Sequence, residues 1–333
     1  GICGKNGIGK TNILDAIFFL CFTKSAFNHS DSVSVKNGTN GFRLTGNFRL
    51  FDQKEEAILI LRENNKKELS INNSVYPKLS QHIGHYPCIL IAPDDSVLIT
   101  GRSEERRSFI DALLSQINEQ YLKNLIHYNK IIQQRNSLLK QFAQTGQINE
   151  TVLAVIDEQL IPLGDAIYNT RAQFLIQFLP KVKNIYNELA DKDEAVSITY
   201  ESHLHHDHFS NILIQNKQKD FALQRTIAGI HRDDLSFLYH NQNFKNIASQ
   251  GQRKTLLFAL KLAEIEVIES VKKFSPIILL DDIFEKLDEN RIQKLLSFIC
   301  TKNSGQVFIT DTQKDRLSSK LSFLKEDLLI IET

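Results

Sequence analysis

Residues near the N-terminus have the types and spacing of a phosphate-binding loop. The pattern G-x-x-x-x-G-K-[ST] is matched by Gly4-Lys5-Asn6-Gly7-Ile8-Gly9-Lys10-Thr11, and a helical run follows from Asn12. Glycines let backbone N–H groups curl around phosphate oxygens, and the helix adds the positive end of its dipole. We expect Lys10 to neutralise the β- and γ-phosphates of ATP, and the Thr11 hydroxyl to bind Mg²⁺. An ordinary glycine turn would need neither side chain.

A pair of carboxylates lies near the other end of the chain. The apolar run from Ser275 to Leu280 is bounded by a proline and ends in Asp281 and Asp282. Such a run is typical of a buried parallel strand that delivers acids to its C-terminal edge. We expect Asp281 to hold Mg²⁺ through water and Asp282 to orient or deprotonate an attacking water. Alone, the pattern would fit an Asp-Asp turn equally well, and the phosphate-binding loop favours the catalytic interpretation.

A third polar cluster, Ser249-Gln250-Gly251-Gln252, precedes a strongly helical run from Thr255 to Glu264. Ser249 is a good N-cap candidate. The hydroxyl, glycine and amides at a helix N-terminus form a second anion-binding surface, although the first loop already covers one face of the nucleotide. We therefore expect Ser249, Gly251 and Gln252 to bind the γ-phosphate of ATP held by another subunit. A capped surface helix would explain Ser249 but not Gln-Gly-Gln.

An α/β lobe must position these clusters. We expect strands at 42–51, 57–62 and 89–92, and turns at 38–41 and 63–65. We also expect the strand that leads into the phosphate-binding loop to begin before residue 1. The predicted division is an ATPase lobe formed by 1–103 and 216–333, with a helical lobe inserted at 104–215.

The inserted lobe is predicted from a change in composition, since residues from about Glu104 to Glu188 contain almost no Gly or Pro. A break at 145–147 predicts an antiparallel return, and Pro162 and Pro180 predict kinks or helix starts. Each helix has room for only a few heptads, so a compact lobe is expected, not a coiled-coil rod. An a/d stripe, interrupted by Arg135, is formed by Tyr121, Leu125, Tyr128, Ile132 and Leu139.

Composition bounds the class of protein. The chain has 333 residues, of which 42% are hydrophobic and 24% charged, which excludes disorder. Its formal net charge of +1 provides no global field for nucleic acid, so a DNA-binding surface must be a local patch. The four cysteines form no C-x-x-C pair, and no apolar run is long enough to span a membrane. We expect a cytoplasmic protein.

Taken together, the motifs resemble the ABC-type ATPase head of the SMC and RecF group. The resemblance covers almost the whole chain and is most specific to the bacterial RecF family. The segments that carry it are Asn6 to Asn12, Gly229-Ile230-His231-Arg232-Asp233-Asp234-Leu235, Ser249 to Lys254, Leu279 to Phe284, and Lys286-Leu287-Asp288.

Two departures from related patterns stand out. The family motif Gly-Pro-His-Arg-Asp-Asp has Ile230 in place of proline, and the switch histidine of transporter ATPases is absent after the strand 306–310. Asp311 or Thr312 would have to sense the γ-phosphate instead. The hairpin with which the family contacts its nucleotide is expected before residue 1, so base recognition is not assigned.

The resemblance implies a weak, slow ATPase that uses ATP and Mg²⁺ and dimerises when ATP binds. It also implies binding to gapped or single-strand/double-strand junction DNA, and work with RecO and RecR to load RecA in recombinational repair. Alternatives are an SMC-type ATPase that tethers chromosomes, which the short helical lobe disfavours, and a monomeric P-loop kinase, which leaves Ser249 to Gln252 unexplained. A transporter ATPase fits less well, since the switch histidine is absent.

Two further groups have alternative interpretations. Arg102, Arg106 and Arg107 would either contact DNA phosphates or, as we favour, pair with nearby acids on a solvated helix face, and the same applies to Lys123, Lys130, Arg135 and Lys140. The tract from His203 to His208 is more typical of an exposed loop than of a metal site, because neighbouring side chains in an extended loop point in different directions.

Overall fold

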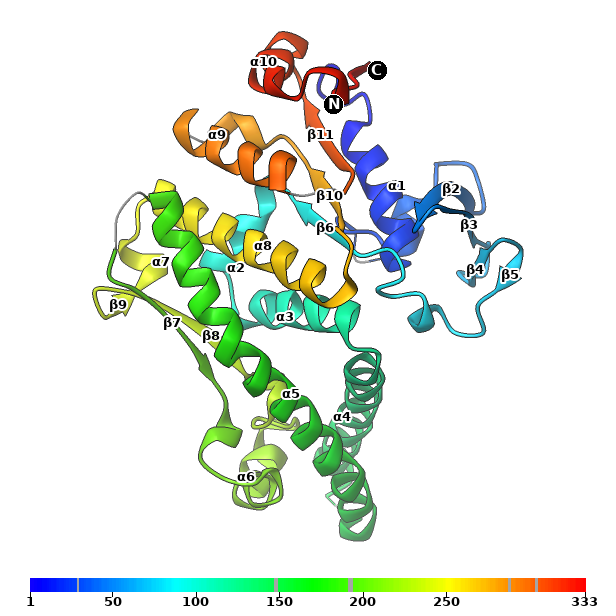
Figure 1. Ribbon diagram of the computed structural model, residues 1–333. Coiled ribbons are helices and arrows are strands. Elements are labelled where there is room, and N and C mark those ends of the chain that lie inside the picture. The colour runs from blue at the N-terminus through cyan, green and yellow to red at the C-terminus, as the bar shows by residue number, and fades with distance from the viewer. Residues whose placement is uncertain (29, 147–148, 191–193, 287–288, 303–304) are drawn as a thin grey trace. The chain divides into compact units, whose positions relative to one another are not determined.

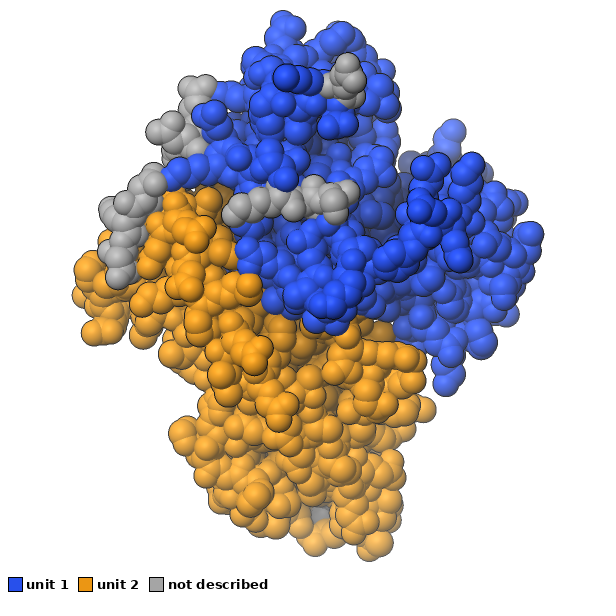
Figure 2. Space-filling view, viewed as in Figure 1, with its two compact units in different colours: residues 1–95, 260–333 blue, residues 96–259 orange. Residues whose placement is uncertain are grey.

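The computed structural model describes residues 1–28, 30–146, 149–190, 194–286, 289–302 and 305–333. These residues form two compact units, shown in different colours in Figure 2. Unit 1 consists of residues 1–95 and 260–333, and unit 2 of residues 96–259.

A five-stranded parallel sheet forms the centre of unit 1 (Figure 1). Most residues of its inner strands are apolar and buried, as is typical of a parallel sheet covered on both faces, whereas the edge strand Ile331–Glu332 is exposed. Helix α1 (Lys10–Phe22) packs against two strands of the sheet, β6 (Cys88–Ile91) and β11 (Val307–Asp311), with Leu14 and Phe19 buried. The strands lie in the order β12 (Ile331–Glu332), β1 (Ile2–Cys3), β11 (Val307–Asp311), β10 (Ile277–Leu280) and β6 (Cys88–Ile91). The C-terminal ends of β1, β10 and β11 therefore meet at one edge.

An antiparallel meander packs on the other side of α1. It consists of β2 (Phe42–Leu50), β3 (Gln53–Leu61), β4 (Lys67–Ile71) and β5 (Ser74–Val75). Phe51 and Asp52 link β2 to β3 with two positive φ angles, 46° and 64°, as a tight hairpin turn requires. The predicted strands are confirmed, and β3 begins earlier than expected, at Gln53.

Unit 1 is completed near the C-terminus by the second half of α8 (Gln250–Lys272), by α9 (Glu289–Ser297) and by α10 (Lys314–Lys320). A five-residue π-helix, Phe298–Lys302, follows α9.

Unit 2 contains the predicted helical hairpin. Helix α4 (Glu119–Thr145) ends at Gly146, whose φ is 69°, and α5 (Glu150–Ala190) returns along it. The predicted a/d stripe is buried along this contact. Neither Pro162 nor Pro180 starts a helix, because α5 runs through both for 41 residues.

The other helices of unit 2 are α2 (Val97–Thr100), α3 (Ser103–Ile117), α6 (Phe209–Leu223), α7 (Phe244–Ile247) and the start of α8. A small antiparallel sheet joins them, with the order β7 (Val196–Glu201), β8 (Asp234–Tyr239) and β9 (Gln242–Asn243). None of the described helices is long and apolar enough to cross a membrane.

Unit 2 extends beyond the predicted lobe of 104–215 and takes in residues 216–259. The physical reason is the pairing of β7 with β8, which runs from Val196 opposite Tyr239 to Glu201 opposite Asp234. Helix α3 packs on β8, so this strand folds with the helices and not with the parallel sheet. Amino-acid composition predicts the helices, but it does not predict the pairing of β7 with β8.

Candidate nucleotide-binding site

The glycine-rich loop connects β1 to α1, which is the strand–loop–helix context that the motif requires. Gly7 and Gly9 have φ angles of 82° and 103°, in the left-handed region that side chains other than glycine rarely adopt. Gly9 is the N-cap of α1 and has no side chain to cap the helix. The first backbone N–H groups of α1 therefore lie beside the loop, where they can donate hydrogen bonds to a bound anion.

Lys10 and Thr11 open the helix. The Lys10 ammonium donates to the backbone oxygens of Gly4 at 2.7 Å and Lys5 at 3.0 Å, so it lies across the loop. The Thr11 hydroxyl donates to Asp281 Oδ2 at 2.9 Å. This single bond joins the phosphate-binding loop to the end of β10, across 270 residues of sequence.

Asp281 is held from two sides. Oδ2 accepts from Thr11, and Oδ1 accepts from the buried hydroxyl of Thr310 at 2.6 Å. Asp281 as a whole residue is 6% exposed, and it directly follows the last residue of β10. A hydroxyl beside a carboxylate is the hard oxygen donor set that Mg²⁺ prefers, so the residues present fit this metal.

Asp282 adopts a left-handed conformation with a φ of 44°, which aspartate tolerates better than most residues. Its backbone N–H donates to Thr310 Oγ1 at 3.1 Å. The chain then turns into the 3₁₀ segment η6 (Ile283–Lys286). Of the predicted motif after the strand, Leu287 and Asp288 lie outside the described residues.

Asn12, which we expect to contact nucleotide, lines a cavity of about 520 Å³ beside α1. Asp15 also lines it and ties the following loop to the helix by accepting from Ser25 Oγ at 2.7 Å and from the backbone N–H of Ala26 at 2.8 Å. Phe19 and Phe42 contribute apolar walls.

Asp311 and Thr312 follow β11. Asp311 is fully buried, which by itself would raise the pKa of its carboxyl. Hydrogen bonds from the Arg316 guanidinium and the backbone N–H of Gln313 outweigh burial and lower that pKa below its usual value. Both Asp311 oxygens accept from Arg316, and the Thr312 hydroxyl donates to Asp311 at 3.3 Å.

The predicted signature forms a capping box at the start of α8, within unit 2. The Gln252 N–H donates to Ser249 Oγ at 3.2 Å, and the Ser249 N–H donates to Gln252 Oε1 at 2.9 Å. The N-cap prediction for Ser249 is confirmed by this reciprocal pair. We expected a capped helix to leave the glutamines unexplained, which was wrong for Gln252, because its side chain is part of the cap. The Gln252 amide also donates to Glu194 at 2.9 Å. Gly251 accepts from the Thr255 hydroxyl one turn later.

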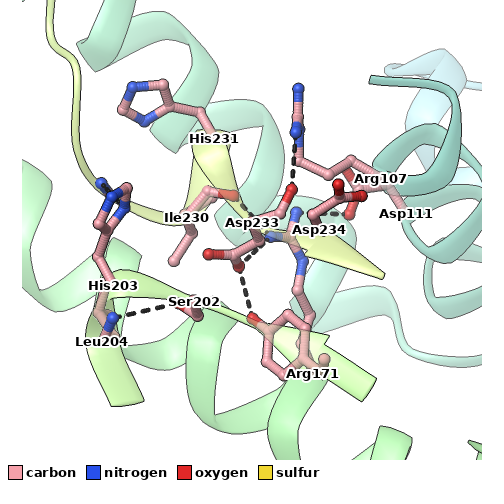
Figure 3. A network of polar contacts seen from close by, with 12 residues as sticks. Arg107, Asp111, Arg171, Ser202, His203, Leu204, Ile230, His231, Asp233 and Asp234 are labelled. Carbon is pink, nitrogen blue, oxygen red and sulfur yellow. Dashed lines mark hydrogen bonds and ion pairs between the residues drawn. The ribbon is translucent and has the colours of Figure 1, made fainter. Parts of the chain in front are cut away.

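The motif at 229–235 is part of a buried polar network in unit 2 (Figure 3). Arg171, from the middle of α5, donates to Asp233 Oδ2 at 2.7 Å, to the backbone oxygen of Ile230 at 2.8 Å and to Asp111 Oδ1 at 2.8 Å. Desolvation opposes ionisation of Arg171, but the charges of Asp111 and Asp233 raise its pKa well above the usual value. One arginine thus joins α5, α3 and the motif.

Arg106 and Arg107 do not form the solvated helix face that we favoured. Arg106 is buried and donates to both carboxylate oxygens of Asp234, at 2.6 and 3.0 Å. Arg107 donates to the backbone oxygen of Asp233 at 2.7 Å (Figure 3). Their partners lie in β8 and just before it, so pairing with neighbours on their own helix was the wrong prediction. Arg102 is exposed.

Arg135 is also buried, so the prediction that it lies on a solvated helix face was wrong. It donates to Asp157 on α5 at 2.7 Å, to Asp220 on α6 at 2.6 Å and to the Thr226 hydroxyl at 2.8 Å. The interruption of the a/d stripe is therefore an internal ion-pair cluster.

The histidine tract contributes hydrogen bonds within unit 2. His205 contacts the Tyr168 hydroxyl at 2.9 Å and the Tyr200 backbone oxygen at 3.0 Å, and Asp207 accepts from His208 N–H and Asn211 at the start of α6. Within the described residues, no group of three or more His, Cys, Asp or Glu side chains is placed to hold a metal ion.

Sequence reasoning missed Thr310 and Arg171. Thr310 is the last-but-one residue of β11 and contacts both Asp281 and Asp282. A hydroxyl at the C-terminal end of a strand beside an acid-bearing strand was the available signal. For Arg171, the only signal was an arginine within an otherwise apolar helical segment.

Known proteins are similar to this chain in sequence and in fold. A model of the RecF/RecN/SMC N-terminal domain matches residues 1–325. The DNA replication and repair protein RecF of Flavobacterium johnsoniae is 41% identical over 313 residues, which cover 94% of this chain and 87% of that protein.

Solved structures with a similar fold support the same family assignment. The recombination mediator protein RecF-ATP of the RecFOR pathway superposes with a TM-score of 0.86 and 28% identity, over 99% of this chain and 88% of that one. An Smc head bound to the C-terminal winged-helix domain of ScpA has a TM-score of 0.50 and 15% identity, over 96% of this chain and 83% of that one, and shows the shared fold alone. The predicted fold class is confirmed: this chain belongs to the RecF/RecN/SMC family, and within it to the RecF group of ABC-type ATPases that act in DNA replication and repair.

Proposed function

We propose that this protein is an ATP-dependent DNA-binding switch, in which two copies close on two ATP molecules and hydrolysis releases them. The observation that carries the proposal is the bond from Thr11 to Asp281, which brings a phosphate-binding loop and an acid-bearing strand to one edge of a parallel sheet. A similar protein was solved with ATP.

Each side chain of the site has a role in this proposal. The loop from Gly4 to Asn12 cradles the phosphates with its backbone N–H groups, and Lys10 neutralises their charge. Thr11 and Asp281 hold Mg²⁺, which supplies charge stabilisation during phosphoryl transfer. Asp282 orients the attacking water and accepts its proton.

The partner copy completes the site. Ser249, Gly251 and Gln252 lie at the N-terminus of the 23-residue helix α8, where backbone N–H groups and the helix dipole favour an anion. In this structure the Gln252 side chain bonds to Ser249 and Glu194 of its own unit. A γ-phosphate presented by a second subunit would compete for the Ser249 hydroxyl and the first N–H groups of α8.

The names of the relatives support the proposed DNA partner and accessory proteins. RecF proteins are named for DNA replication and repair, and one solved relative is a recombination mediator in the RecFOR pathway. We therefore propose that the closed dimer binds gapped or junction DNA in the cytoplasm and works with RecR and RecO to load RecA.

Lys10→Ala tests the nucleotide role, with Lys5→Ala as the matched control. Both variants lose one loop lysine, but only Lys10 lies across the loop through bonds to its backbone oxygens. A charge-assisted contact contributes about 1.5–3 kcal/mol, so Lys10→Ala should weaken binding of a fluorescent ATP analogue by about 10- to 100-fold. Lys5→Ala should bind within about threefold of the unmodified protein. Equal affinity of the two variants would remove the phosphate-binding assignment.

ATP-dependent DNA binding is the second test. Fluorescence anisotropy with a gapped duplex should show tighter binding when ATP and Mg²⁺ are present, and Lys10→Ala should lose that gain. If the unmodified protein binds DNA with the same affinity with and without ATP, the proposed switch is contradicted.

The SMC-type alternative is less well supported. Its likeness extends to the fold alone, at 15% identity. Helix α5, with 41 residues, is about 60 Å long, which is short for an arm that tethers chromosomes.

A further inference from the structure

One hydroxyl lies between the two acids of the candidate ATPase site. Thr310 Oγ1 donates to Asp281 Oδ1 at 2.6 Å and accepts from the backbone N–H of Asp282 at 3.1 Å. The Thr310 residue is 0% exposed, so no solvent competes for either bond. The two contacts use the donor and the acceptor capacity of a hydroxyl at once, which an apolar side chain of the same shape cannot reproduce.

The hydroxyl is itself held in a fixed place. Thr310 lies in β11, between β1 and β10, and is opposite Ile2 of β1. The preceding residue, Ile309, is opposite Leu280, which directly precedes Asp281. Ladder hydrogen bonds on both sides of β11 fix the backbone, and a β-branched side chain in a strand has few rotamers.

The two bonds act on different properties of the acids. At Asp281, Thr310 occupies Oδ1 while Thr11, the other proposed Mg²⁺ ligand, contacts Oδ2. The oxygen that faces the phosphate-binding loop is thereby fixed. At Asp282, the bond holds the backbone in a left-handed conformation with a φ of 44°. This conformation is energetically unfavourable for residues other than glycine unless surrounding contacts stabilise it.

We propose that Thr310 is a positioning residue that orients Asp281 toward Mg²⁺ and fixes the backbone turn that carries Asp282. This inference rests on the proposed function, since it assigns a role within the same ATP site. Partners of this kind, which bind a metal ligand rather than the metal, typically change metal affinity or activity by about 10- to 100-fold when removed.

The first test compares Thr310→Val with Thr310→Ser. Valine keeps the shape and removes the hydroxyl, whereas serine keeps the hydroxyl and removes a methyl group. Thr310→Val should raise the Mg²⁺ concentration for half-maximal ATP hydrolysis and lower kcat, each by about 10-fold or more, with KM for ATP changed less than about threefold. Thr310→Ser should restore most of both values.

A binding measurement separates positioning from loss of activity. A fluorescent ATP analogue should bind Thr310→Val and the unmodified protein with similar affinity in EDTA, because the loop backbone and Lys10 are intact. The gain in affinity on adding Mg²⁺ should be lost in Thr310→Val and kept in Thr310→Ser. Thr45→Val, at an exposed site on β2, controls for a threonine-to-valine change in a strand and should behave as the unmodified protein.

Thermal unfolding without nucleotide shows whether each variant is folded. If Thr310→Val does not fold, Thr310→Ala and Thr310→Ser form the replacement pair, since they differ only by the hydroxyl. Thr310→Ala should then show the Mg²⁺ defect and Thr310→Ser should not.

The outcomes are distinguishable. Equal Mg²⁺ dependence in hydroxyl-bearing and hydroxyl-free variants, with an unmodified protein that binds ATP and hydrolyses it, overturns the role of Thr310 and leaves the proposed function standing. An unmodified protein that binds no ATP at all overturns the proposed function itself.

Discussion

At the scale of single residues, buried arginines organise unit 2. Arg135 and Arg171 are 0% and 2% exposed, and each is surrounded by carboxylates from different elements. A buried charge is tolerated only when it is paired and hydrogen-bonded. These two side chains therefore specify which helix faces and loops pack together. Apolar contacts alone would specify this packing less strictly.

Arg171→Met should destabilise the protein strongly. The change keeps an apolar side chain of similar length but leaves Asp233 and Asp111 without their cation. Removing one partner of a buried ion pair costs about 3–5 kcal/mol. Urea unfolding followed by circular dichroism would measure this loss. Arg62→Met, at an exposed pair with Glu68, should leave the unfolding midpoint unchanged, and equal effects of the two variants would contradict the account.

His82 gives unit 1 a defined pH dependence. The side chain is 0% exposed; burial is the main cause that lowers its pKa from 6.5 to about 4, although a hydrogen bond to the Leu20 backbone oxygen opposes the shift. The unfolded chain therefore binds a proton more readily than the folded one. The contribution of His82 to the free energy of unfolding is fully present above pH 6.5 and is lost as the pH falls toward 4.

The loss should amount to about 3 kcal/mol between pH 6.5 and pH 4. Urea titrations at several pH values would measure it, and His82→Phe should flatten the dependence in this window. Burial of the nearby Glu55 would raise the pKa of its carboxyl, but hydrogen bonds from Tyr86 and His85 outweigh burial and lower that pKa, so this group contributes to the pH dependence mainly below its ordinary pKa of 4.5. An unchanged slope in His82→Phe would assign the effect to other groups.

At the scale of elements, the motif at 229–235 is a turn fixed by close packing. Gly229 has a φ of 128°, and a Cβ there would lie 2.8 Å from the Phe209 ring and 3.1 Å from the Tyr128 hydroxyl. Ile230 follows in a short 3₁₀ segment, Ile230–Arg232, and is buried. This structure accommodates isoleucine where the family pattern has proline.

Gly229→Ala should be more destabilising than Gly146→Ala. Both glycines have positive φ, at 128° and 69°, but nothing lies within 4 Å of a Cβ at Gly146. Gly146→Ala therefore carries only the conformational cost of a left-handed alanine, about 1–2 kcal/mol, whereas Gly229→Ala adds the displacement of two buried rings. Differential scanning calorimetry of the two variants would compare them. A smaller effect at Gly229 would contradict the packing argument.

Helices α1, α3 to α5 and α8 and the parallel strands β6, β10 and β11 were predictable from local patterns, because periodicity and apolar runs are local in sequence. The short strand β12 and helices α6, α9 and α10 were not predicted. The capping box at Ser249 and the loop context of Lys10 were predictable for the same reason. The partners of Arg106 and Arg171 were not, since they lie 128 and 62 residues away and no spacing rule links them. Thr310 shares this property: its role depends on which strands are neighbours, which local sequence does not specify.

At the scale of the whole molecule, the motifs of the proposed function belong to different compact units. The phosphate-binding loop, Asp281 and Asp282 belong to unit 1, and Ser249 to Gln252 belong to unit 2. Helix α8 begins in unit 2 with the signature and continues in unit 1, so one helix belongs to both. A dimer that closes on ATP would place the signature of one copy against the loop of the other.

Sedimentation velocity of the full-length Asp282→Asn protein tests this central claim most directly. The variant should bind ATP without hydrolysing it and so accumulate the closed state. We expect a shift from monomer to dimer when ATP and Mg²⁺ are added, and loss of that shift when Ser249→Arg is introduced, with ATP binding by the monomer intact. A monomer throughout, at concentrations where ATP binding is saturated, would contradict the shared-site switch.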